Sequence, residues 1–120
     1  MFRETLEKMA NNCDGAIATL VMGFDGIPVE SVIKDESVDV HTVSTEFSFV
    51  LTQVRKAAEI LEVGLLDEVS IRSENLTFVV RVLTEEYFLG MALSPQGNFG
   101  KGRFLMRLAL PELRAELSGA

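Results

Sequence analysis

Apolar residues recur along the chain with two different spacings, one typical of helices and one typical of strands. In the first segment an apolar residue returns every three or four positions, which predicts a short amphipathic helix that ends at Asp14-Gly15. The residues of this stripe are Phe2, Leu6, Met9 and Cys13. Residues 16–22 are nearly all apolar, as in a strand buried on both faces.

A tight turn and a return strand follow this first strand. Asp25-Gly26 readily adopts the positive φ that short hairpin turns need. The return strand is expected over Ile27–Ile33. Because Pro28 has no N–H to donate to a neighbouring strand, we expect this strand at an edge of the sheet.

The longest periodic segment predicts a helix over residues 40–63. Asp39 is a suitable N-cap and Gly64 a suitable stop, so both ends carry helix signals. The face expected to join the core consists of Val43, Phe47, Val50, Leu51, Val54, Ala57, Ala58 and Leu61. Three further apolar residues lie on the opposite side among polar ones: Phe49, Ile60 and Val63. A surface helix normally presents polar residues there, so this second stripe is expected to face a partner.

The second half of the chain predicts three strands and a closing helix. Alternation over 68–73 is typical of a half-buried strand, and apolar runs at 76–83 and 87–93 complete a meander. The closing helix is expected over Arg103–Leu117, with a kink or a break near Leu110 because Pro111 interrupts it. Its candidate core residues are Phe104, Leu105, Leu108 and Leu113. Hairpin-connected strands with helices packed on the sheet indicate an α+β class.

Composition narrows the function classes. The chain has 120 residues, which fits a single domain over 1–120, and a net charge of −7, which disfavours nucleic acid or an anionic membrane as a partner. No apolar run approaches the roughly 20 residues that span a bilayer, so we expect no membrane insertion. The lone Cys13 allows no internal disulfide and fits a reducing compartment, so a cytoplasmic location is expected.

A glycine-rich loop at residues 92–104, ALSPQGNFGKGRF, invites comparison with a phosphate-binding loop. The P-loop pattern G-x-x-x-x-G-K-S/T requires a glycine where Pro95 stands and a hydroxyl where Gly102 stands. The spacing of the glycines also fails the dinucleotide pattern G-x-G-x-x-G. We therefore interpret the loop as a connection from a strand into a helix and expect no nucleotide there.

Reactive side chains do not gather in any recognisable motif. His41 is the only histidine and has no second metal-type ligand at a useful spacing. Cys13 lies in an apolar stripe, and Ser94 lacks a G-x-S-x-G frame. We expect no catalytic residue, no metal and no cofactor, and a protein that acts by binding.

The C-terminal half resembles bacterial members of the roadblock (dynein light-chain) family. The resemblance rests on residues 87–93, on the loop up to Phe104, on Ala109-Leu110-Pro111-Glu112-Leu113 and on the order of elements over the whole chain. It implies a five-stranded antiparallel sheet with the long helix on one face and the two terminal helices on the other. It also implies a homodimer built around the long helix and the third strand. The interface candidates are Phe49, Ile60, Val63, Val69, Ser70, Ile71 and Arg72.

The family regulates or scaffolds small Ras-like GTPases, including one that acts in bacterial polarity and gliding motility. The resemblance thus implies a dimeric GTPase regulator or scaffold, with Glu46, Gln53 and Lys56 as candidate contacts to the GTPase. Two alternatives stay open: a dimeric interaction module without a GTPase, and a small-molecule sensor. A pocket with convergent polar groups would favour the sensor.

Overall fold

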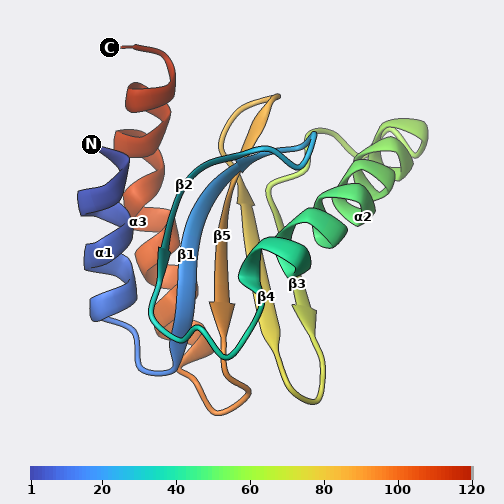
Figure 1. Cartoon of the computed structure of the whole chain (residues 1–120). Helices are drawn as coiled ribbons and strands as arrows, with labels where there is room; N and C mark the ends of the chain where they lie inside the picture. Colours follow the sequence, from blue (N-terminus) through green and yellow to red (C-terminus); the bar gives the residue numbers. More distant parts are fainter. Residues whose placement is uncertain (120) are drawn as a thin grey trace.

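The structure is a computed structural model that describes residues 1–119. Five strands and three helices follow one another along the chain in the predicted order (Figure 1). The elements are α1 (Phe2–Asn11), β1 (Ala16–Gly23), β2 (Pro28–Ile33), α2 (Val40–Ile60), β3 (Glu68–Arg72), β4 (Thr77–Val82), β5 (Tyr87–Leu93) and α3 (Phe99–Leu117).

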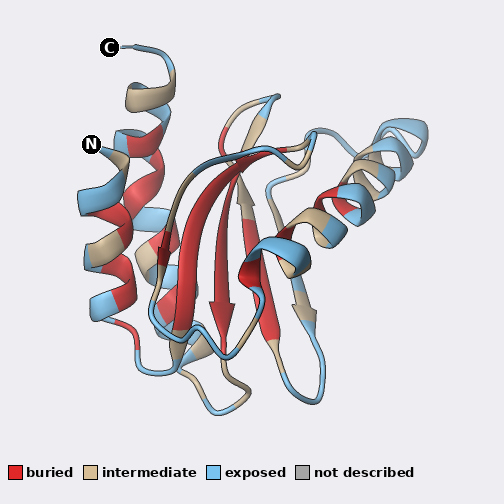
Figure 2. Cartoon of the chain, viewed as in Figure 1, coloured by how far each residue is buried: buried red, intermediate tan, exposed pale blue. Residues whose placement is uncertain are grey.

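All five strands form one antiparallel sheet in the order β2-β1-β5-β4-β3. β2 lies at one edge, as Pro28 predicted, and β3 lies at the other. The ladder between β1 and β2 has an irregularity next to Met22, which lies opposite Pro28. The central strands β1, β5 and most of β4 are buried, because helices cover them on both faces (Figure 2).

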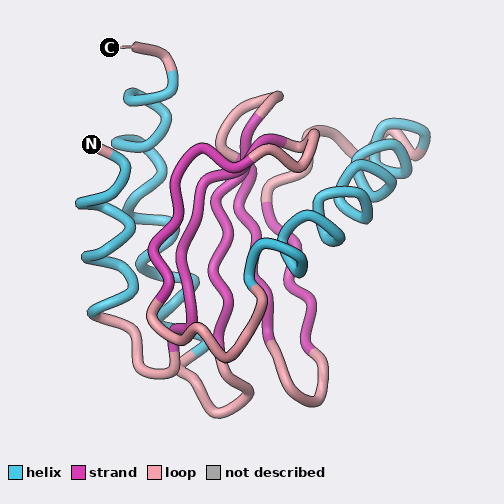
Figure 3. The backbone as a smooth tube through the Cα atoms, in the orientation of Figure 1, coloured by secondary structure: helices cyan, strands magenta, loops and turns pink. Residues whose placement is uncertain are grey.

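Two hydrophobic cores fill the spaces between the sheet and the helices. α1 and α3 lie side by side and pack on one face through residues such as Leu6, Met106 and Leu113 (Figure 3). α2 packs on the other face, where Leu51 is buried with Phe78 and the ring of Phe47 lies 5.2 Å from that of Phe78. This arrangement confirms the predicted α+β fold, with the long helix on one face and the terminal helices on the other.

Only the first half of α2 covers the sheet, and the second half projects past it (Figure 1). The buried positions are Val40, Ser44, Ser48 and Leu51. The expectation that Val50, Ala57 and Leu61 belong to the core was wrong: all three are exposed. They follow the helical period correctly, but no strand lies beneath most of this half of the helix. The helix also ends at Ile60, before Val63, because Glu62 adopts a positive φ of 54°.

The closing helix is longer than predicted and unbroken. It begins at Phe99, where the Asn98 side chain accepts a hydrogen bond from the N–H of Lys101, and it continues through Pro111. Phe104 and Leu108, predicted as core residues, are exposed, while Met106, Ala109 and Leu110 are buried instead. The expected break near Leu110 was therefore wrong. Proline removes one backbone hydrogen bond, and the burial of the neighbouring residues outweighs that loss.

Candidate protein-interaction surface

An exposed apolar surface extends from the middle of α2 into the loop that follows the helix. Phe49 is 55% exposed, Ile60 80% and Val63 71%. Val50, Leu61 and Leu65 extend the same region and are exposed as well. An uncovered apolar group of this size on one element is typical of an interface with another protein.

The three polar candidates lie on the same exposed side of α2. Glu46, Gln53 and Lys56 are all exposed. At about 100° per residue they share a single helix face with Phe49 and Ile60, opposite the buried Leu51. The structure therefore places apolar and charged side chains together on a face that a partner can reach.

The four candidates from β3 lie along the free edge of the sheet. β3 pairs with β4 on one side only, so the outer backbone groups of residues 69–72 have no neighbouring strand. Val69 and Ile71 are half-buried, and Val69 packs with the core beneath α2. Ser70 and Arg72 alternate with them and are exposed. An unpaired edge of this kind accepts a strand from another chain.

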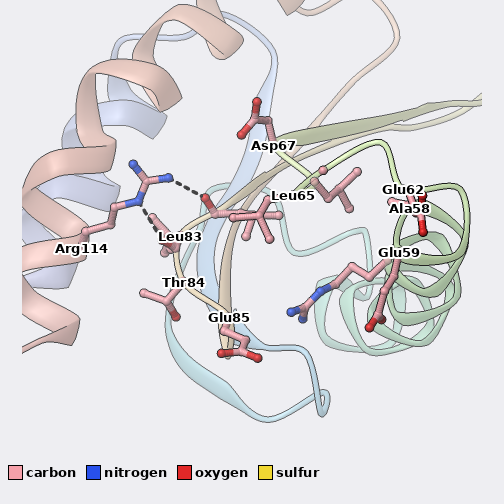
Figure 4. A pocket seen from close by; sticks show the side chains of 13 residues that line it. Ala58, Glu59, Glu62, Leu65, Asp67, Leu83, Thr84, Glu85 and Arg114 are labelled. Carbon is pink, nitrogen blue, oxygen red and sulfur yellow. Dashed lines mark hydrogen bonds between the residues drawn. The ribbon is translucent and has the colours of Figure 1, made fainter.

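A groove of about 730 Å³ opens where α2 separates from the sheet (Figure 4). Its walls come from the end of α2, the α2–β3 loop, the β4–β5 turn and α3. Arg114 reaches it from α3 and donates hydrogen bonds to the carbonyls of Leu83 (2.7 Å) and Val82 (3.0 Å). The lining residues are Arg55, Ala58, Glu59, Glu62, Gly64, Leu65, Leu66, Asp67, Val82, Leu83, Thr84, Glu85 and Arg114.

The groove was not predicted, because its residues come from segments far apart in the sequence. One signal was present: Leu65 is an apolar residue directly after the expected helix stop, where polar residues are usual, and it is almost fully exposed. Arg55 is anchored near the groove, with its guanidinium 4.0 Å from the centre of the Phe24 ring. This stacking holds a cation beside the projecting half of α2.

The glycine-rich loop at 92–104 is explained by close packing. A side chain at Gly15, which has a φ of +84°, would collide with the Cα of Gly97. A side chain at Gly102 would meet the sulfur of Met91 at 2.9 Å. These glycines let the start of α3 lie directly on the α1–β1 turn and on β5. The absence of nucleotide binding stays a prediction.

Cys13 and His41, two of the reactive groups considered from the sequence, lie on opposite faces of the sheet. Cys13 is buried in the core under α1 and α3, and burial raises the pKa of its thiol. His41 is exposed at the start of α2. Within residues 1–119, no group of three or more histidine, cysteine or acidic side chains is placed to hold a metal ion. In that same range, no helix is long and apolar enough to cross a membrane.

Comparison with solved structures identifies the family. The crystal structure of MglC from Myxococcus xanthus is 46% identical in sequence and covers 96% of this chain and 98% of its own, with a TM-score of 0.71. The chain belongs to the roadblock family. No family model matches the sequence, and no curated protein matches it either.

Other roadblock structures share the fold at much lower identity. The gliding protein MglB from Thermus thermophilus is 17% identical over 98% of this chain and 89% of its own, with a TM-score of 0.86. A roadblock domain from Streptomyces avermitilis is 11% identical over 96% of both chains, with a TM-score of 0.84. MglC is therefore more similar in sequence, whereas MglB from Thermus thermophilus is more similar in structure. The roadblock arrangement itself persists through extensive sequence change.

Proposed function

We propose that the protein is a dimeric regulator or scaffold of a small Ras-like GTPase, acting by binding in the cytoplasm and not by catalysis. The observation that carries this proposal is the exposed face of α2, where Phe49 and Ile60 lie beside Glu46, Gln53 and Lys56. The chain is similar to MglC and to MglB, and MglB is called a gliding protein. This similarity supports a small GTPase as the choice of partner.

The dimer is proposed to form through β3 and α2. Pairing of two β3 edges extends the sheet through main-chain hydrogen bonds. The same approach brings two α2 helices together, so that Phe49, Ile60 and Val63 become buried. An obligate interface of this kind buries roughly 2,000 Å² or more in total.

The GTPase is proposed to lie across both α2 helices of the dimer. Glu46, Gln53 and Lys56 are exposed in the single chain, and we propose that they supply polar contacts to the GTPase from the rim of this face. A regulator shifts the state of a GTPase only when it binds one nucleotide state more tightly than the other. We therefore expect unequal affinity for the GDP-bound and GTP-bound forms.

The test is capture of a Ras-like GTPase from the same genome, loaded with GDP or with a GTP analogue, followed by rates of hydrolysis and exchange. We expect preferential capture of one form, weakened by Gln53→Ala combined with Lys56→Glu. Lys8→Glu, on α1 and far from α2, is the control. Capture that is equal in both states, with unchanged rates, favours the alternative of a dimeric module without regulatory action.

The small-molecule sensor remains as a second candidate, and the groove beside α2 favours it. Its volume of about 730 Å³ is in the range of ligand sites, and two arginines and several carboxylates line it. The groove is open, however, since Leu65 on its wall is 97% exposed. A thermal-shift screen with small metabolites tests this candidate: stabilisation that is lost in Arg55→Ala supports a sensor, and no stabilisation by any metabolite counts against it.

A further inference from the structure

A second surface lies on the opposite side of the sheet from α2, where α3 meets the β3 edge. Here the alternate residues of β3 and β4 point toward α3, so that Glu68 lies beside Arg81 in the ladder. Two further arginines, Arg103 and Arg107, approach from α3. Together they line a polar hollow of about 150 Å³, which we call the arginine hollow; its lining residues are Glu68, Arg81, Gly100, Arg103, Phe104 and Arg107.

The arginine hollow is positively charged in an acidic protein. Its lining holds three guanidinium groups and one carboxylate, whereas the whole chain has a net charge of −7. A fourth arginine, Arg72, lies next to it, with its guanidinium 4.7 Å from the centre of the Phe99 ring. This local reversal of charge fits an anionic group on a partner.

Glu68 neutralises only part of this charge. It accepts hydrogen bonds from Nε (3.1 Å) and Nη2 (2.7 Å) of Arg103, and Nη1 of Arg81 lies 3.7 Å away. The buried Nε of Arg81 has no acceptor among the described residues. The ion pairs in this region that the described residues form involve Arg81 and Arg103, and Arg107 takes no part in them. The guanidinium of Arg107, which is exposed, therefore remains for a further carboxylate.

An apolar strip continues the hollow along α3. Phe104 is 46% exposed and Leu108 61% exposed, and the guanidinium of Arg107 lies 6.0 Å from the centre of the Phe104 ring. Arginine and aromatic side chains are enriched at the positions that contribute most to binding between proteins. Because stacking and the Glu68 pair already orient the guanidiniums, binding costs little of their side-chain entropy.

We propose that the arginine hollow and the strip formed by Phe104 and Leu108 dock an acidic segment of a partner protein. Carboxylates of this segment bind the guanidiniums of the hollow, and one of its apolar side chains packs on Phe104 and Leu108. The surface is separate from the α2 face, so the inference does not rest on the proposed GTPase.

The exposed apolar strip distinguishes this surface from one that binds nucleic acid or lipid headgroups. Phosphate backbones are recognised by widely distributed positive charge, and the rest of this chain is acidic. A compact charged hollow next to an aromatic side chain instead matches a short peptide with both carboxylates and an apolar residue. DNA and anionic vesicles are therefore included as competing probes.

The test is fluorescence anisotropy with a set of labelled short peptides rich in Glu and Asp, each with one Trp or Leu at a varied position. We expect binding by the wild type that weakens steeply at about 0.5 M salt. Arg107→Glu should weaken it at least about fivefold, as expected for a contact at the centre of an interface. Lys8→Glu changes the net charge equally and should leave binding unchanged.

Glu68→Gln is expected to have the opposite effect on peptide binding from Arg107→Glu. It removes the carboxylate of the hollow and frees its arginines, so binding of the acidic peptides should strengthen severalfold. A gain of affinity cannot result from damage to the fold. The proposal is overturned if no peptide binds, if Lys8→Glu weakens binding as much as Arg107→Glu does, or if a DNA duplex or phosphatidylserine vesicles bind more tightly than every peptide.

Discussion

At the scale of single residues, the fold depends on Gly15, which combines a positive φ with close contact to Gly97. Gly15→Ala forces a side chain into both constraints, and we expect a loss of about 3 kcal/mol in the free energy of unfolding. Urea denaturation measures it. Gly64 has a φ of +92° but nothing within 4 Å of an added Cβ, so Gly64→Ala is the matched control, with a loss of about 1 kcal/mol from backbone strain alone. Equal losses in both variants would show that the packing of Gly15 on Gly97 contributes nothing.

The Glu68–Arg103 pair gives a residue-scale prediction about pH. Hydrogen bonds from Arg103 hold the pKa of Glu68 below its ordinary value, so the folded state binds fewer protons than the unfolded state. This contribution to stability is present above the ordinary glutamate pKa of about 4.3 and is lost as pH falls through the lower folded pKa.

Glu68→Gln should therefore flatten the decline of the urea midpoint below about pH 4.3. Glu74→Gln, in the exposed turn between β3 and β4, is the control and should keep the decline of the wild type. A decline in Glu68→Gln as steep as that of the wild type would contradict this role of the pair.

Residue burial could be predicted from the sequence only in part. Periodicity identified the apolar faces of α2 and α3, and Leu51 and Leu113 are indeed fully buried. It failed for Leu61 and Leu108, which are exposed. Helical spacing indicates which residues share a face of the helix. How much of that face is buried depends on where the strands lie.

At the scale of elements, the exposed apolar face of α2 is the feature that indicates a partner. Phe49→Glu places a charge among its exposed apolar residues, and a buried unpaired charge is costly. We expect the dissociation constant of the homodimer to rise by about 100-fold or more. Sedimentation velocity over a dilution series measures it.

Val29→Glu is the control for this element. Val29 is 41% exposed and lies on β2, the edge strand at the opposite end of the sheet from β3. The dissociation constant should stay within about twofold of the wild type. An equal effect of both substitutions would argue against an interface at α2.

Element order was predictable because each element has its own local signals. Asp39 caps α2 as expected, its carboxylate accepting a hydrogen bond from the N–H of Thr42 at 3.2 Å. Pro28 marked an edge strand correctly. The break expected at Pro111 does not occur, because the low helix propensity of one residue competes with the burial of a whole helix face. The start of α3 was missed for a similar reason: Gly100 and Gly102 suggested a loop, whereas both lie in the helix and Gly102 packs closely on the sulfur of Met91.

We predict that the glycine-rich loop at residues 92–104, which leads into α3, binds no nucleotide. Pro95 and Gly102 occupy the positions that a phosphate-binding loop gives to glycine and to a hydroxyl residue. Calorimetry with magnesium-bound ATP and GTP should give no heat of binding. Binding that disappears in Lys101→Ala would contradict this interpretation of the loop.

At the scale of the whole molecule, element order and family resemblance predicted the layered arrangement. The candidate sites could be predicted from the sequence only in part. The α2 stripe and the β3 edge were visible in the sequence. The groove at Arg55 and Arg114 and the arginine hollow were not, since each joins side chains from segments far apart in the chain. Only the folded sheet brings them together.

We expect the α2 and β3 surface to form an interface, first of all with a second copy of this chain. Sedimentation equilibrium of the wild type at micromolar concentration tests it most directly. We expect a mass of twice the 13.2 kDa of one chain. A mass of one chain across the concentration range would contradict it.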